Sequence, residues 1–435
     1  MAESAVTPRF LSDVYQGASE CNKCSLCQAV CPTYVVNPVE WETARGRVSL
    51  VRDAIEGKLE LADIEDGPLS TCLTCDCCVA ACAPAVPTAT IVSRARQELN
   101  AQRGHPFGQT IAMRAIFPRP LVLRFLHGFS RFTQVTGLHE AVRRTGVTRW
   151  LGTPGHLAEH LGPVPRYSAY RRARDLPSAQ EPIRGRLAFL VCCYQNAAVP
   201  EATEASMKVL LNEGYELVVP QLGCSGLPAR TLGDRDAELD MAVRTVERLR
   251  DLDVDGFVGD VASCTGQWRN YRNLVGDDPL VGEDARRIGS RTWLLSRFFS
   301  HVGLRSLLGP LHWKVAIDEP CSLPLTPEDR EASRKLLQSI PRLTITPFEE
   351  AAMCCGGPGL YFAQQPERSE AILARKFDKV IQSGADVLVT ENVSCITQLR
   401  AGARRYAPHV RVMHLFEVID ASIERGKRRA AVIPQ

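Results

Sequence analysis

The sequence predicts a multidomain protein of α and α/β class, in which a helical, cysteine-rich N-terminal domain precedes two duplicated α/β domains. Three observations support this prediction. Two dense runs of cysteines fall within the first 82 residues, further cysteines mark an internal repeat in the C-terminal half, and each repeat alternates short apolar strands with helices. The expected domains are residues 1–103, an Arg/Pro-rich helical connector at 104–186, and the two repeats at 187–310 and 311–435.

Composition narrows the class of protein before any motif is considered. The chain has 435 residues, of which 45% are hydrophobic and 23% charged, and a net charge of +3, which is too mild to indicate a nucleic-acid partner. It contains 17 cysteines, but its opening residues do not resemble a secretory signal. In a reducing compartment, clustered cysteines are more often metal ligands than disulfides, so we expect a cytoplasmic protein.

The two N-terminal runs have the spacing of iron–sulfur ligands. Cys21-x2-Cys24-x2-Cys27-x3-Cys31 is the first, and Cys72-x2-Cys75-x2-Cys78-x3-Cys82 is the second. Three cysteines two residues apart wrap one [4Fe–4S] cluster, while the fourth binds the other cluster. The prediction is therefore one cluster on Cys21, Cys24, Cys27 and Cys82, and another on Cys72, Cys75, Cys78 and Cys31. Zinc sites mostly pair two C-x2-C hooks, so zinc is the weaker interpretation.

Residues around these motifs suggest a mostly helical two-cluster ferredoxin domain. Helices are expected at 48–55 and 89–102, and the arrangement resembles that of succinate dehydrogenase iron–sulfur subunits. Cys77, between two ligands, is expected to be a spare thiol pointing away from the cluster, although a swap of ligands stays open. Arg45 and Arg47 could raise the cluster potentials or be ordinary solvated or salt-bridged side chains.

The connector contains one amphipathic helical pattern. Its apolar stripe, Val122, Phe125, Leu126, Phe129 and Phe132, lies opposite Arg124, His127 and Arg131. Such a helix packs on its own protein, on a partner subunit or on an anionic membrane surface. His156 and His160 are expected to be surface histidines, since the glutamate of a zinc-enzyme motif is absent. Residues 162–186, rich in proline, are expected to be a linker.

The C-terminal repeat is marked by Cys193, Cys224 and Cys264, which recur as Cys321, Cys354 and Cys395 at offsets of 128, 130 and 131. Strands are expected at 187–191, 216–219, 256–259, 314–317, 343–346 and 386–390, with helices at 201–212, 234–252, 328–338 and 366–383. The cysteines follow the strands closely. They therefore lie at the carboxyl edge of each expected parallel sheet, where open α/β folds bind ligands.

The second repeat gathers four candidate ligands: Cys321, Cys354, Cys355 and Cys395. They could hold a third cluster, a zinc ion or a redox-active thiol pair, and the alternative is a set of buried small residues. In the first repeat Ser225 replaces the second cysteine of the pair. Only Cys193, Cys224 and Cys264 remain there, with Cys192 as a candidate fourth, so no cluster is expected.

Together the paired cluster motifs, the Ala44-Arg45-Gly46-Arg47 turn and the Cys-Cys-Gly halves resemble the iron–sulfur subunit of bacterial glycolate oxidase. Related subunits of anaerobic glycerol-3-phosphate dehydrogenase and heterodisulfide reductase are also similar. The resemblance implies a separate FAD subunit that oxidises a 2-hydroxy acid, with electrons passed to quinone or another carrier, and a place in the cytoplasm or at the inner face of the membrane. It carries over the eight N-terminal ligands and the Cys-Cys-Gly cysteines.

Two departures from that pattern concern the C-terminal half. Ser225 breaks the first Cys-Cys-Gly motif, and Asp318-Glu319-Pro320 precedes Cys321 where relatives often carry a histidine. Both leave the cofactors of the two repeats open.

The absence of a G-x-G-x-x-G fingerprint and of a P-loop assigns substrate oxidation to another chain. Two alternatives are disulfide or quinone reduction at Cys354–Cys355, as in heterodisulfide reductase, and a zinc-held scaffold. Against the former, Gln398 stands where a further cysteine would follow Cys395.

Overall fold

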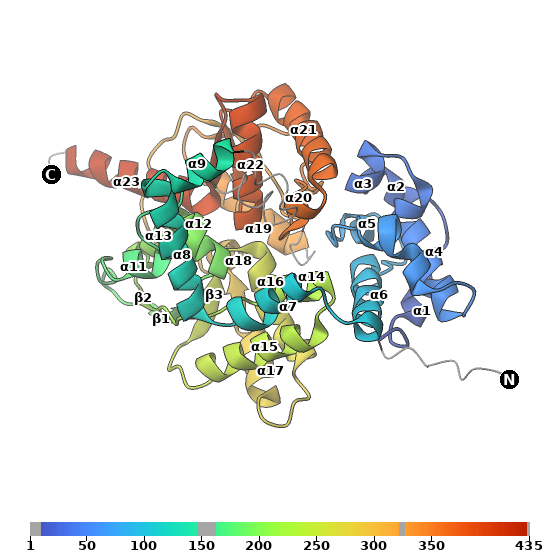
Figure 1. The fold of residues 1–435 in the computed structure, drawn as a ribbon. Helices are drawn as coiled ribbons and strands as arrows, with labels where there is room; N and C mark the ends of the chain where they lie inside the picture. The colour runs from blue at the N-terminus through green and yellow to red at the C-terminus, as the bar shows by residue number, and fades with distance from the viewer. Residues whose placement is uncertain (1–9, 146–161, 322–326, 433–435) are drawn as a thin grey trace.

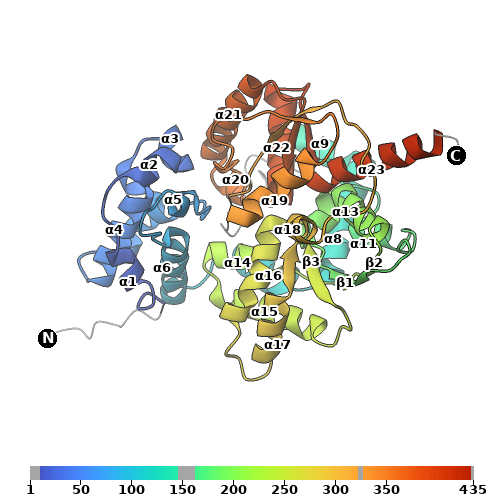
Figure 2. The ribbon, with the colours of Figure 1, turned by 180° about the vertical axis from the view of Figure 1, so that it is seen from behind.

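The computed structural model describes residues 10–145, 162–321 and 327–432 (Figure 1). The N-terminal domain lies to one side of a larger body formed by the two repeats, and the view from behind shows the same arrangement (Figure 2). Its helix α3 packs on α21 of the second repeat and α6 packs on α14 of the first. The N-terminal domain therefore contacts both repeats.

The N-terminal domain is helical, as expected. A core of Leu11, Val51, Leu69, Ile91 and Val92 joins its helices. The Thr43 hydroxyl accepts a hydrogen bond from Gly46 N at 3.0 Å and so caps the N-terminus of the helix Ala44–Ile55. The helices are α1 (Tyr15–Ser19), α2 (Leu26–Val30), α3 (Pro32–Val36), α4 (Ala44–Ile55), α5 (Cys77–Ala80) and α6 (Thr88–Arg103), with single turns at Glu40–Glu42, Leu61–Ile64 and Glu65–Leu69.

Each repeat forms a parallel four-stranded sheet, in the orders β2-β1-β3-β4 and β6-β5-β7-β8. The expected strands are present, but the expectation of three strands per repeat was wrong. The fourth strands are short and run straight into helices, so no separate apolar run marks them. The strands are β1 (Gly185–Phe189), β2 (Tyr215–Val218), β3 (Gly256–Gly259), β4 (Thr292–Leu294), β5 (Lys314–Ile317), β6 (Thr344–Ile345), β7 (Val387–Thr390) and β8 (Arg411–His414).

The two repeats share their hydrophobic cores. One buried cluster joins Leu190 and Phe257 of the first repeat to Phe377 and Leu388 of the second, and α23 packs on α13 across the boundary. The helices are α12 (Cys193–Ala198), α13 (Pro200–Asn212), α14 (Leu227–Leu232), α15 (Arg235–Leu249), α16 (Ala262–Leu274), α17 (Gly282–Ser290), α18 (Leu295–Val302), α19 (Pro327–Gln338), α20 (Tyr361–Gln364), α21 (Pro366–Ser383), α22 (Val393–Tyr406) and α23 (Leu415–Val432).

The connector lies on the first repeat. Cys224 N donates to the carbonyl oxygen of Phe117 at 2.9 Å, and the apolar stripe is a helix, as predicted. The helices are α7 (Phe107–Ile111), α8 (Pro120–Val135), α9 (Leu138–Arg144) and α11 (Ala169–Ala173), with a π turn at Ala112–Ile116. His156 and His160 lie outside the described residues.

The expected linker at 162–186 is in part a packed segment. Its helix α11 buries Ala169 completely, and Leu222 N donates to the Tyr170 hydroxyl at 3.0 Å. Within the described ranges, no helix has both the length and the apolar character needed to cross a bilayer.

Candidate cysteine sites

Both N-terminal cysteine runs form the same tight loop. In each loop two residues between the cysteines adopt positive φ angles: Lys23 (54°) and Ser25 (72°) in the first, Thr74 (50°) and Asp76 (57°) in the second. Left-handed residues turn the backbone sharply, and a short helix, α2 or α5, then begins. The repeated backbone strain is a mark of a ligand-binding loop.

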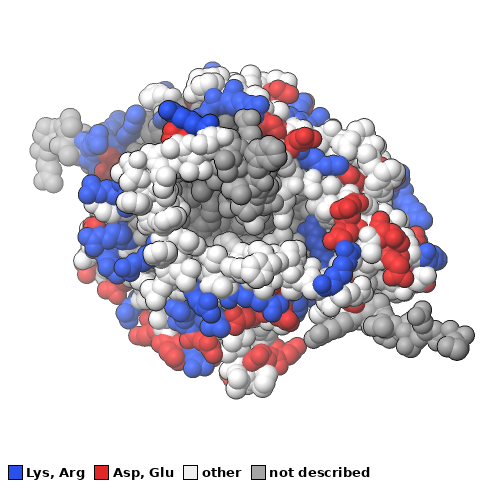
Figure 3. All heavy atoms as spheres, in the orientation of Figure 1, with Lys and Arg blue, Asp and Glu red and all other residues white. Residues whose placement is uncertain are grey.

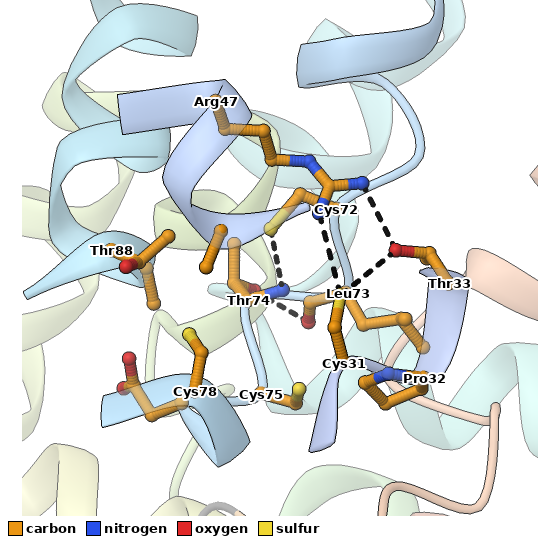
Figure 4. Close-up of a pocket in the computed structure, with 13 residues that line it drawn as sticks. Cys31, Pro32, Thr33, Arg47, Cys72, Leu73, Thr74, Cys75, Cys78 and Thr88 are labelled. Carbon is orange, nitrogen blue, oxygen red and sulfur yellow. Dashed lines mark hydrogen bonds between the residues drawn. The ribbon is translucent and has the colours of Figure 1, made fainter. Parts of the chain in front are cut away.

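Four thiols meet in a pocket beside the second loop. Cys31, Cys72, Cys75 and Cys78 line it together with Arg47 and Thr88 (Figure 4). These are the four residues that the spacing assigns to one cluster. Cys77 does not line this pocket.

Arg47 provides a test of what this pocket would hold. Its side chain is buried, with 2% exposure, and donates to Pro68 O at 2.6 Å, Thr71 Oγ1 at 2.8 Å and Thr33 Oγ1 at 3.2 Å. Its remaining donor points at Cys31 Sγ, 3.8 Å away (Figure 4). In the part of the chain that the structure describes, Arg47 makes no ion pair with a carboxylate. A buried, unpaired cation is costly, so the pocket fits an anionic occupant such as a thiolate-bound iron–sulfur cluster.

Electrostatics at the pocket agree with this. Burial works against the charged form of Arg47, but negative charge on Cys72 and Cys31, with a smaller contribution from the Glu42 carboxylate, outweighs burial and raises the pKa of the guanidinium. Arg96, which does not line this pocket, donates to Cys72 O at 2.7 Å. Across residues 10–145, 162–321 and 327–432, no group of three or more His, Cys, Asp or Glu side chains closes on a single-ion site.

The other N-terminal set is more open. Cys24 is exposed, and the nearby Leu26 of the same loop is 56% exposed; Trp41, before α4, is 57% exposed. Burial raises the pKa of the Cys27 thiol, with neighbouring Cys31 and Cys21 adding to the rise. Cys21 and Cys82 both pack at the edge of the N-terminal core.

Arg45 and Arg47 serve different loops. Arg45 pairs with Glu40 and donates to Lys23 O at 3.2 Å, within the first cysteine loop, whereas Arg47 reaches the pocket of the second. Gly46 between them lets the start of α4 lie close against the Glu40–Glu42 turn, because a Cβ at Gly46 would lie 2.3 Å from the carbonyl oxygen of Glu40.

In the second repeat, the four predicted cysteines form a chain of thiol contacts. Cys321 contacts Cys354, Cys354 contacts Cys355, and Cys355 contacts Cys395. They come from the loop after β5, the turn after β6 and the start of α22, which meet at the carboxyl edge of the sheet. Asn392 Nδ2 donates to Cys395 Sγ at 3.4 Å.

A buried ion pair joins these cysteine-bearing segments. Lys376 of α21 pairs with Asp318, and both side chains are nearly inaccessible. Lys376 Nζ also donates to Ala351 O at 2.9 Å and Met353 O at 2.6 Å, while Thr390 Oγ1 donates to Asp318 Oδ2 at 2.8 Å. Burial opposes the charge of Lys376, but Asp318 outweighs burial and raises the lysine pKa. Asp318, which stands in the segment where relatives often carry a histidine, therefore has a structural partner.

The first repeat also brings four thiols together. Cys192 Sγ lies 3.1 Å from Cys264 Sγ and contacts Cys193, which in turn contacts Cys224. Ser225 Oγ donates to Cys264 Sγ at 3.5 Å. Sulfhydryl hydrogen bonds from Cys193 and Cys264 lower the pKa of Cys192. Cys192 thus lies within the group, and the Cys192–Cys193 pair at the start of α12 was its sequence signal.

Several residues of these sites carry no sequence signal. Arg96, Lys376 and Tyr361 reach the cysteines only through the packing of distant segments. The Tyr361 hydroxyl donates to Thr71 O at 3.1 Å, and Arg368 forms a two-pronged ion pair with Glu42. These contacts dock the second repeat on the N-terminal domain, with Cys75 contacting both Cys321 and Cys354.

Comparison with known proteins agrees with this architecture. The family model described as "Cysteine-rich domain" (CCG) matches residues 187–269 and again 315–400. A second model, "Glycolate oxidase iron-sulfur subunit, linker region", matches residues 105–160.

Full-length relatives are similar along nearly the whole chain. A probable glycolate oxidase iron–sulfur subunit from Bacillus subtilis (strain 168) is 27% identical over 92% of each chain. The glycolate oxidase iron–sulfur subunit of Escherichia coli (strain K12) is 23% identical over 93% of this chain and 94% of its own. Lactate utilization protein A of an Exiguobacterium species is 26% identical, over 55% of this chain and 99% of its own.

A helical domain with two cysteine loops, joined to paired CCG domains, defines the class as iron–sulfur proteins. Within that class the linker match and the full-length similarity are decisive. The chain belongs to the glycolate oxidase iron–sulfur subunit family.

Proposed function

We propose that the chain carries electrons for a flavin-dependent 2-hydroxy-acid dehydrogenase complex of the glycolate type, using two [4Fe–4S] clusters in the N-terminal domain. Cys21, Cys24, Cys27 and Cys82 would hold one cluster, and Cys31, Cys72, Cys75 and Cys78 the other. When bound, such clusters accept and release single electrons. The observation that supports this most strongly is Arg47, a buried cation at the four-thiol pocket with no carboxylate partner in the described chain.

The arrangement of the cysteine groups suggests separate roles for the two loops. The first loop has Cys24 at the surface, and its apolar residue Leu26 is exposed, as is Trp41. The second loop faces inward, where Cys75 contacts the cysteines of the second repeat. The first loop is therefore the proposed contact for the FAD-bearing subunit, and the second connects to the interior.

The second repeat is the proposed place of a third iron–sulfur centre. Two of its thiols, Cys355 and Cys395, lie close to the buried cation Lys376, whose charge favours anionic thiolates. At the position equivalent to Asp318 the first repeat has Leu190, which is fully buried, and it carries Ser225 in its Cys-Cys-Gly motif. We therefore assign no cluster to the first repeat.

Anaerobic purification with iron analysis tests the assignment. We expect about twelve irons per chain, about eight of them from the two N-terminal clusters, and co-purification of a flavoprotein with the natural complex. Cys24→Ser should remove about four irons and the signal of one cluster. Zinc in place of iron, or a natural complex without flavin, would contradict the proposal.

The exposed face of α8 is a proposed contact with an anionic lipid surface. Phe125, Phe129 and Phe132 are 70%, 54% and 60% exposed, and no described residue of this helix is buried. From Leu99 to His139 the chain contains no acidic residue but five arginines. The surface over α8 is mostly white in the space-filling view, with Lys and Arg at its border (Figure 3). Apolar rings flanked by cations match the chemistry of an anionic bilayer interface.

Co-sedimentation with vesicles tests this contact. The double change Phe125→Glu and Phe129→Glu should lower binding to phosphatidylglycerol vesicles by more than about tenfold, since each buried ring contributes about 1.5–3 kcal/mol. Leu280→Glu is the matched control, because Leu280 is 83% exposed at a distant loop. If the wild-type protein does not bind vesicles, and the two changes cause the flavoprotein to dissociate, then α8 is instead a subunit interface.

A further inference from the structure

Cys77 has a position that the two cluster motifs do not require. It occupies the same place in the second loop as Leu26 in the first, since each is the residue directly before the third cysteine. Leu26 faces solvent, whereas Cys77 lies against the second repeat. The pocket of Cys31, Cys72, Cys75 and Cys78 excludes the Cys77 side chain from its lining.

The Cys77 thiol points instead at the cysteines of the second repeat. It contacts Cys321, as well as Cys75 of its own loop, and donates to the carbonyl oxygen of Ala352 at 3.5 Å, two residues before Cys354. Leu73, Tyr361 and Ile372 surround this contact and are buried. A partly buried thiol that faces other thiols beside apolar side chains is a suitable metal ligand.

The second repeat itself offers no further thiol at this side of the site. Gln398, three residues beyond Cys395, is turned away: its Nε2 donates to Ser369 Oγ at 3.0 Å and its side chain packs over Gly357. The neighbour of Cys321 that belongs to no other four-cysteine set is therefore Cys77, contributed by a different domain.

We propose that Cys77 is a fifth thiolate ligand of the iron–sulfur centre of the second repeat, beside Cys321, Cys354, Cys355 and Cys395. This four-iron centre then differs from a cubane with one thiolate per iron, and it is held jointly by the N-terminal domain and the repeat. The proposal rests on the third centre assigned above and adds a residue that lies about 240 positions away in the chain from Cys321. Binding the centre then fixes the two domains together. The contacts of Arg368 with Glu42 and of Tyr361 with Thr71 border the same junction.

The test uses the full chain, purified anaerobically, with Cys77→Ser as the variant. We expect iron to fall from about twelve to about eight per chain, with loss of the same spectroscopic signal that Cys321→Ser removes. The signals of the two N-terminal clusters should persist. Leu26→Ser, at the equivalent place in the first loop, should keep all the iron.

A second readout follows from the shared site. Amide hydrogen exchange of α5 and α20 should quicken in Cys77→Ser and stay slow in Leu26→Ser, and Cys77→Ala should behave as Cys77→Ser does. Full iron content and an unchanged third signal in Cys77→Ser would overturn the proposal. A wild-type chain with eight irons and no third signal would overturn it too, while leaving the two-cluster function in place. A chain without iron would overturn both.

Discussion

Replacement of Arg47 by methionine is expected to lower the reduction potential of the cluster at Cys31, Cys72, Cys75 and Cys78 by on the order of 100 mV. A unit charge about 6 Å away at an effective dielectric constant of about 20 is worth about 3 kcal/mol, which is on the order of 100 mV for a one-electron couple. The guanidinium is buried, so solvent screens it little. Anaerobic redox titration followed by paramagnetic resonance measures the shift.

Two companion variants separate charge from hydrogen bonding. Arg47→Lys keeps the charge but loses the fork that reaches Pro68, Thr33 and Thr71, so most of the potential should be retained while thermal stability falls. Arg45→Met should act on the other cluster and more weakly, because Arg45 is partly exposed and already paired with Glu40. Equal potentials for both clusters in wild type and Arg47→Met would show that neither cluster is bound beside Arg47.

Replacement of Lys376 by methionine is expected to destabilise the chain by about 3–5 kcal/mol, the usual cost of leaving a buried charge without its partner. Asp318 would lose its cation, and the carbonyl groups of Ala351 and Met353 would lose their donor. The turn that carries Cys354 and Cys355 would then be less firmly held. Chemical denaturation followed by tryptophan fluorescence should show an earlier unfolding midpoint.

The first repeat supplies the matched control for this experiment. Leucine stands there at the position of Asp318, so the double variant Lys376→Met and Asp318→Leu removes both charges and should recover most of the lost stability. Iron at the second repeat should not recover, because the cation beside the thiols is still missing. An unchanged unfolding midpoint in Lys376→Met would mean that the ion pair contributes nothing to the fold.

Much of the fold could be predicted because local patterns determine it. Residues 256–259, 314–317 and 366–383 match β3, β5 and α21 in full, since short apolar runs and an amphipathic helix identify themselves. The strands β4 and β8 were not predicted from the sequence. Each is at most four residues long and passes directly into a helix, so its strand character comes from pairing with β3 or β7.

The candidate sites, too, could be predicted only where the residues lie close together in the sequence. Cysteine spacing groups the ligands within a loop, but Cys77 against Cys321 and Lys376 against Asp318 are contacts between segments that only the tertiary fold brings together. The spacing predicts that Cys77 points away from its own cluster, and in the structure its thiol contacts Cys321 and the carbonyl oxygen of Ala352. No periodicity or motif encodes a partner more than 200 residues away.

The shared hydrophobic cores of the two repeats have a consequence for evolution and for protein engineering. A fragment carrying either repeat alone would expose the side chains that its twin now covers, so it should aggregate instead of folding. Selection can therefore relax the chemistry of one half, as at Ser225, but cannot delete that half. The degenerate repeat persists as the other half of an indivisible folding unit.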